Sequence, residues 1–136
     1  SRARRDAIVI GADQVLSFEG EALGKPASRE DAVERLRAMR GKVHVLETAV
    51  VCARDGAIQW SHLARPELTV RDVSDGFLRT YCETAGDGIM SSAGAYQLEG
   101  RGAQLFERID GDYFAILGLP LLPLLGYLRE AGALPR

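Results

Sequence analysis

The segment from residue 8 to residue 26 constrains the fold of this chain more than any other part of the sequence. Its β-branched run Ile8-Val9-Ile10 predicts a short buried strand. Gly11 is expected to end that strand, which would place Asp13 just past its carboxyl end. Ligand-binding groups gather at this position in open α/β sheets, so Asp13 is a candidate functional residue.

Lys25 adds a cation to the same segment. It stands between Gly24 and Pro26, in a stretch that favours a loop. A mobile lysine beside a fixed carboxylate suits metal–polyphosphate chemistry, because a metal ion and an ammonium group both neutralise phosphate charge. A purely structural ion pair between Asp13 and Lys25 is the alternative that these residues leave open.

The first half of the chain predicts a hairpin or a bent strand, followed by a helix. An apolar run at residues 15–18 and a turn at residues 19–21 indicate either a hairpin or a strand bent at a bulge. Ser28 is a favourable N-cap, and Asp31 three positions later gives a pairing of the capping-box kind. The apolar positions of this helix leave Arg35, Arg37 and Arg40 on its outward side.

The second half of the chain predicts further strands and two more helices. The expected elements are strands over residues 42–53, 57–63 and 67–73, a helix capped by Ser74, and a last helix from about Pro120 to Ala131. His44 is expected to be a packed or surface histidine, and Tyr96 a core aromatic. This order of elements favours an α/β or α+β fold formed by a single domain over residues 1–136.

Composition excludes several classes of function. The chain has 136 residues, of which 46% are hydrophobic and 26% charged, and this is typical of a globular protein. The net charge of −2 gives no electrostatic reason to expect binding to nucleic acid or a membrane surface. The apolar stretch at residues 115–128 is too short to span a bilayer. Cys52 and Cys82, with no secretory signal, predict a reducing, cytoplasmic setting.

The chain starts at Ser1 and reaches its first strand candidate within seven residues. We therefore expect the amino-terminal part of the domain to be missing from these 136 residues.

Six short segments occur in an order that spans nearly the whole chain. They are Ile10-Gly11-Ala12-Asp13, Leu23-Gly24-Lys25-Pro26, Gly41-Lys42-Val43-His44, Ala93-Gly94-Ala95-Tyr96, Gly111-Asp112-Tyr113 and Gly118-Leu119-Pro120-Leu121. Together they resemble the Maf family of nucleoside triphosphate pyrophosphatases, which are also described as septum-formation inhibitors. The resemblance implies an α/β fold with a mixed sheet and flanking helices. It also implies two lobes around a central cleft, as in inosine triphosphate pyrophosphatases.

The resemblance implies that a nucleoside triphosphate is hydrolysed to its monophosphate and pyrophosphate with a divalent metal ion, Mg²⁺ or Mn²⁺. Asp13 matches the family's general base, and whether it also binds the metal is left open. Lys25 matches the phosphate-binding lysine. Water needs such a base because it is a poor nucleophile until its proton is removed. The triphosphate needs cations because its own charge repels the attacking oxygen.

Parts of the family's site are missing from these residues. The family's Ser-x-Ser-Pro-Arg-Arg loop, its metal-binding glutamate and a further lysine have no counterpart here. The alternative function is therefore a non-catalytic module that binds nucleotides or takes part in a cell-division-related interaction. The expected partner is a nucleoside triphosphate, with neither nucleic acid nor membrane, and a homodimer is left open.

Two further positions concern the choice of base and are expected to bind substrate. Gln14 stands where the subgroup that hydrolyses dTTP and UTP has threonine, and Glu99 stands where it has glutamine. Both residues resemble the subgroup that hydrolyses 7-methyl-GTP. Ala95 and Tyr96 instead resemble the dTTP/UTP pattern, so the sequence lies between the two subgroups.

Overall fold

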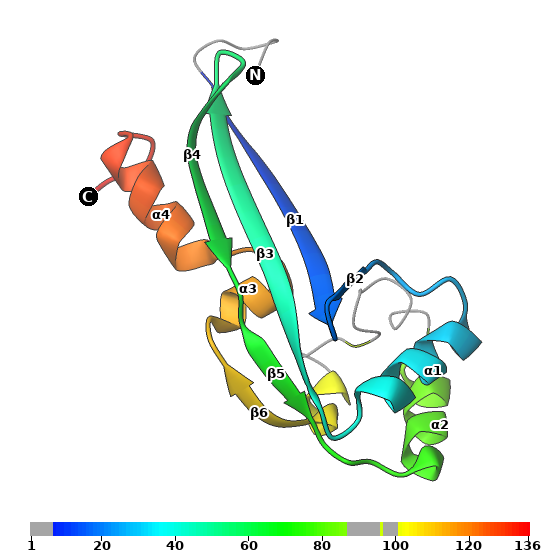
Figure 1. Cartoon of the computed structure of the whole chain (residues 1–136). Coiled ribbons are helices and arrows are strands. Elements are labelled where there is room, and N and C mark those ends of the chain that lie inside the picture. Colours follow the sequence, from blue (N-terminus) through cyan, green and yellow to red (C-terminus); the bar gives the residue numbers. More distant parts are fainter. Residues whose placement is uncertain (1–6, 87–95, 97–100) are drawn as a thin grey trace.

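The computed structural model describes residues 7–86, 96 and 101–136. Figure 1 shows a long twisted sheet with helices packed at both of its ends. The strands are β1 (Ile8–Phe18), β2 (Glu21–Leu23), β3 (Val43–Arg54), β4 (Ala57–Ala64), β5 (Glu67–Val70) and β6 (Phe106–Asp110). The helices are α1 (Arg29–Met39), α2 (Asp75–Thr84), the 3₁₀ helix η2 (Arg101–Leu105), α3 (Tyr113–Leu117) and α4 (Leu121–Glu130).

β3 is the central strand of the sheet. The strand order is β2-β1-β3-β5-β6, and β4 also pairs with β3. Every pairing between the described strands is antiparallel. The twelve residues of β3 are long enough to pair with β5 near one end and with β4 near the other, on the same edge. The α/β class with flanking helices is therefore confirmed with an antiparallel sheet, whereas the two lobes and the central cleft stay predictions.

β1 differs from the short buried strand that the sequence predicts. It does not end at Gly11 but continues to Phe18, and Val9 and Ile10 are 42% and 45% exposed. Glycine weakens a strand without ending it when a neighbouring strand supplies continuous pairing, and β3 pairs with β1 throughout this stretch. Val9 and Ile10 lie on a part of β1 whose other edge is open, because pairing with β2 begins only at Leu16.

The local signals for turns and helices are confirmed. The hairpin between β1 and β2 forms, and Ser28 caps α1 by accepting a hydrogen bond from the Asp31 backbone nitrogen at 3.0 Å. Ser74 caps α2 in the same way. The strand predicted over residues 67–73 ends at Val70, and the sequence did not predict β6, η2 or α3.

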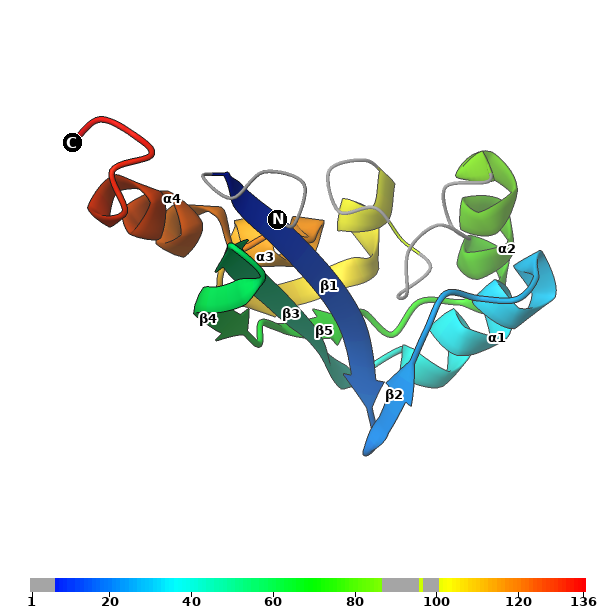
Figure 2. The same cartoon turned by 90° about the horizontal axis from the view of Figure 1, so that it is seen from above.

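Two apolar clusters cover one face of the sheet. The larger joins β1, β3 and β5 to α1 and α2, and it includes Leu16, Leu46 and Leu36. The smaller joins the other end of β3 to α4, through Val50 and Leu124. Figure 2 shows these helices at opposite ends of the sheet, with α3 between them. The middle of this face is polar, because Gln14 and Thr48 pair there between the two clusters.

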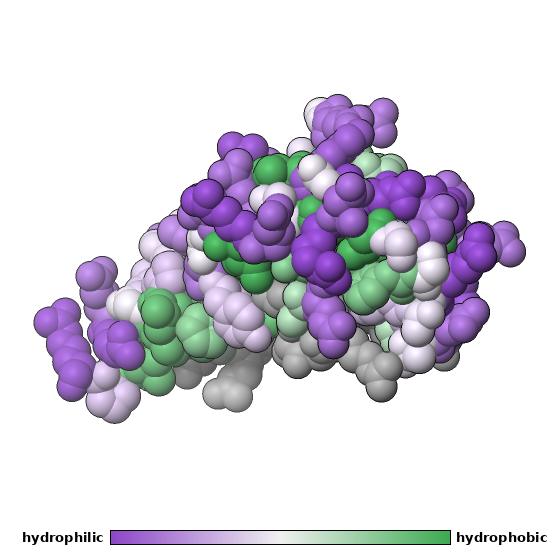
Figure 3. Space-filling view, turned by 90° about the horizontal axis from the view of Figure 1, so that it is seen from below, coloured by the Kyte–Doolittle hydropathy of each residue, from purple (hydrophilic) through white to green (hydrophobic). Residues whose placement is uncertain are grey.

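The outer surface mixes polar and apolar residues. Seen from below, hydrophobic patches alternate with hydrophilic side chains rather than merging into one apolar face (Figure 3). Among the described residues, no helix combines the length and apolar character needed to cross a membrane.

Candidate functional site

Asp13 lies in the middle of β1, opposite Ala49 of β3. The predicted position past the end of a strand is therefore wrong, because pairing with β3 carries β1 five residues further. The carboxylate is exposed, and its Oδ1 accepts a hydrogen bond from the backbone nitrogen of Gln14 at 2.9 Å. Its Oδ2 accepts no hydrogen bond from the described residues. One oxygen is thus held by the backbone while the other can accept a proton from a bound molecule.

Lys25 lies in the loop between β2 and α1. Its side chain is exposed, whereas the following Pro26 is buried. Although both residues are described, Asp13 and Lys25 form no ion pair within 4.0 Å. The structure therefore gives no support to the alternative that these two residues serve only as a structural ion pair.

Side chains of α1 hold both flanks of the Lys25 loop. A guanidinium nitrogen of Arg35 donates to the carbonyl oxygen of Gly24. On the other flank, Oδ2 of Asp31 accepts from the backbone nitrogen of Ala27 at 3.0 Å. The side chain of Arg35 is only 12% exposed, so the outward orientation predicted for it is wrong. Helical periodicity could not reveal this contact, because it depends on how the preceding loop folds back on the helix.

Gln14 points to the opposite face of β1 from Asp13. Its Nε2 lies 3.1 Å from Oγ1 of Thr48 and 3.0 Å from the carbonyl oxygens of both Ala115 and Ile116, and it donates to these acceptors. The Thr48 hydroxyl also donates to Ala115, at 2.8 Å. These carbonyls belong to the last turn of α3, where that of Ala115 also accepts from the backbone nitrogen of Gly118 at 3.1 Å. Gln14 thus ties α3 to the sheet, and its role in binding substrate stays a prediction.

His44 and Tyr96 are packed inside the larger apolar cluster. Nε2 of His44 lies 2.7 Å from the Tyr96 hydroxyl, and the rings of Tyr96 and Phe106 pack edge to face. Burial lowers the pKa of His44 to about 4, so the imidazole is uncharged at neutral pH. Burial also raises the pKa of the Tyr96 phenol. The predictions of a packed histidine and a core aromatic are confirmed.

The described residues do not locate two predicted features of the site, which are Glu99 and the divalent metal ion. Glu99 lies outside the described residues. Within the described part of the chain, no three His, Cys, Asp or Glu side chains form a cluster that could hold a metal ion. Magnesium often takes only one or two carboxylates and completes its coordination with substrate phosphates and water. The exposed carboxylate of Asp13 fits that kind of site.

Comparison with known proteins agrees with the motifs. The family model of the Maf-like proteins matches residues 1–131. This chain belongs to the Maf-like family. It is 57% identical over 133 residues to a protein of Hyphomonas neptunium named nucleoside triphosphate pyrophosphatase, covering 98% of this chain and 67% of that protein.

Two further relatives differ in the substrate that their names give. A nucleoside triphosphate pyrophosphatase of Rhodospirillum rubrum is 54% identical, over 98% of this chain and 66% of that protein. A protein of Rhizobium etli named 7-methyl-GTP pyrophosphatase is 49% identical, over 95% of this chain and 65% of that protein. The chain thus spans about two thirds of the length of the curated relatives that it matches.

Proposed function

We propose that the protein to which this chain belongs hydrolyses a nucleoside triphosphate to its monophosphate and pyrophosphate. The observation that carries the proposal is the Asp13 carboxylate, exposed at the centre of β1 with one oxygen fixed by the Gln14 backbone. Family membership and the names of the relatives support it.

Asp13 acts as the general base in this proposal. It removes a proton from a water molecule, whose oxygen attacks the α-phosphorus. The bond from that phosphorus to the bridging oxygen breaks, and pyrophosphate leaves. Lys25 neutralises the phosphate oxygens, because its exposed ammonium extends from a loop held by α1. A divalent cation, Mg²⁺ or Mn²⁺, would be held by Asp13 and the phosphates and would neutralise further charge.

Substitution of Asp13 by asparagine tests this role. The change keeps the size and most hydrogen bonds of the side chain but removes its ability to take a proton. We expect kcat of the whole protein to fall by about 10²–10⁴-fold. Pyrophosphate release measures the rate, and Asp110→Asn, an exposed aspartate on β6, is the control. Near-normal turnover by a folded Asp13→Asn variant would show that another group is the base.

We further propose that guanine-type bases are preferred to pyrimidines. The name of the Rhizobium etli relative supports 7-methyl-GTP as a substrate. A 7-methylguanine ring carries positive charge, and its amide and amino groups offer two donors to a carboxylate such as Glu99. We expect Glu99→Gln to lower the ratio of 7-methyl-GTP turnover to UTP turnover. An unchanged ratio would mean that Glu99 does not select the base.

The expected setting of this activity is the cytoplasm. Both cysteines, Cys52 and Cys82, are buried and unpaired, as is usual in reducing compartments. Homodimer formation stays a prediction.

A further inference from the structure

Lys25 sits on a backbone that is fixed on both sides. Pro26 restricts its own φ angle and disfavours the helical region for Lys25 before it. Upstream, the carbonyl of Gly24 accepts from Arg35, and downstream the nitrogen of Ala27 donates to Asp31. The side chain of Lys25 itself stays exposed. The loop is therefore constrained while the ammonium is left accessible.

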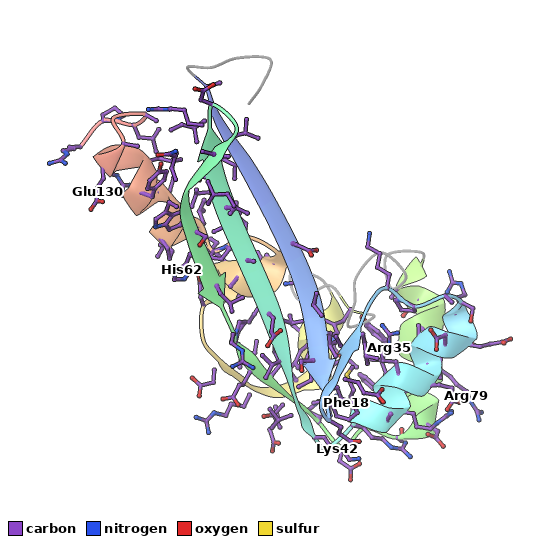
Figure 4. All side chains as sticks on the ribbon, turned by 45° about the horizontal axis from the view of Figure 1, so that its top comes forward. Phe18, Arg35, Lys42, His62, Arg79 and Glu130 are labelled. Atoms are coloured by element: carbon purple, nitrogen blue, oxygen red, sulfur yellow. The ribbon has the colours of Figure 1, made fainter. Side chains whose placement is uncertain are left out.

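The two groups that hold the loop also face each other. Arg35 and Asp31 are four residues apart on α1, and Nη2 of Arg35 lies 3.8 Å from Oδ2 of Asp31. Asp31 is oriented in turn by the helix cap, since its backbone nitrogen donates to Oγ of Ser28 at 3.0 Å. Figure 4 shows Arg35 between α1 and β2. A single turn of helix thus reaches the backbone on both sides of the lysine.

We infer that Arg35 and Asp31 are positioning residues for Lys25 and that they hold it ready to bind the triphosphate. This inference rests on the proposed function. Binding is favoured when the backbone that carries a charged group need not be ordered at the moment of contact, and small displacements of such groups can cost large factors in rate. Neither side chain needs to touch the substrate, because each acts through the backbone next to Lys25.

A double-mutant cycle with Lys25 tests the inference in the whole protein. We expect Arg35→Ala to raise KM for the triphosphate about tenfold with a smaller change in kcat, since the ground state and the transition state both lose the positioned ammonium. In a Lys25→Ala background, Arg35→Ala should have no further effect on kcat/KM. A merely structural role would lower kcat/KM by the same factor in both backgrounds, and that result would overturn the inference.

Arg37 provides the matched control. It lies on the same helix and contacts the exposed carboxylates of Glu34 and Asp75 rather than the loop. Arg37→Ala should therefore leave KM within about twofold of the parent. An equal rise in KM for Arg37→Ala and Arg35→Ala would also overturn the inference.

Two conservative variants show whether the effect of Arg35→Ala comes from the lost contact or from misfolding. Arg35→Lys keeps a charged donor and should restore part of the lost affinity, whereas Asp31→Asn keeps an acceptor for the Ala27 nitrogen and should have little effect. KM values for Arg35→Lys and Asp31→Asn as high as that of Arg35→Ala would contradict the inference. If Lys25→Ala itself leaves kcat/KM unchanged, the proposed role of Lys25 fails. If Lys25→Ala lowers kcat/KM but Arg35→Ala does not, only the inference fails.

Discussion

Thr48 is the residue on which the polar middle of the sheet depends. It is fully buried, lies opposite Gln14, and donates to the carbonyl oxygen of Ala115. A buried hydroxyl is stable there only because it forms hydrogen bonds. Gln14 and Thr48 thus contact α3 through directional hydrogen bonds rather than through apolar packing, and these bonds fix the position of α3.

Substitution of Thr48 by valine should therefore destabilise the protein despite its similar shape. The valine cannot donate to Ala115 or accept from Gln14, and we expect the free energy of unfolding to fall by about 1–3 kcal/mol. Urea denaturation measures the change. Thr48→Ser, which keeps the hydroxyl, should lose less stability, and a serine variant as unstable as the valine variant would show that the methyl group is what matters.

Short-range signals explain most of what the sequence could predict. The caps of α1 and α2 and the turn between β3 and β4 depend on residues three or four positions apart, so the sequence alone was sufficient. The extent of β1 could not be predicted, because it is set by pairing with β3, a strand that lies far away in the sequence. The contacts of Gln14 could not be predicted for the same reason, because Thr48 lies 34 positions and Ala115 101 positions away in the sequence.

At the scale of elements, the loop from β6 to α3 is held close to Pro66, which immediately precedes β5. Gly111 has a φ angle of 129°, and a Cβ atom there would lie 2.8 Å from Cα of Pro66. Such an approach is possible only without a side chain. Asp112, which follows, caps α3 by accepting from the backbone nitrogen of Phe114 at 2.9 Å. The glycine therefore lets β6 turn into α3 directly beside Pro66.

Alanine at position 111 should open this contact. Gly118 is a matched control, because its φ of 121° imposes similar strain on alanine, while no described residue outside its immediate chain neighbours has an atom within 4 Å of the added Cβ. We expect Gly111→Ala to cost about 1–3 kcal/mol more than Gly118→Ala, owing to the steric overlap with Pro66. Thermal unfolding of both variants measures the difference, and equal losses would show that backbone strain alone determines the cost.

At the scale of the whole molecule, Asp75 and His44 both make the free energy of unfolding depend on pH in the acidic range. Hydrogen bonds from Arg37 and then Arg40 hold the pKa of Asp75 below its ordinary value of 3.8. Its contribution to stability is therefore lost only as the pH falls below about 4. Burial instead holds the pKa of His44 at about 4, below its ordinary 6.5, so its effect appears at higher pH. The two groups can be separated by the pH range in which each acts.

We expect the free energy of unfolding to decrease as the pH falls from 6.5 to 4, because of His44. In this range the unfolded chain binds a proton at this residue and the folded protein does not, so each drop in pH favours unfolding. A shift of this size corresponds to roughly 3 kcal/mol across the range. Urea denaturation at four pH values from 7.5 to 4.5 should show the decline in the parent protein and a flatter profile for His44→Gln. His62→Gln controls for the loss of a histidine as such. Identical slopes in the parent and His44→Gln would assign the acid sensitivity to other groups.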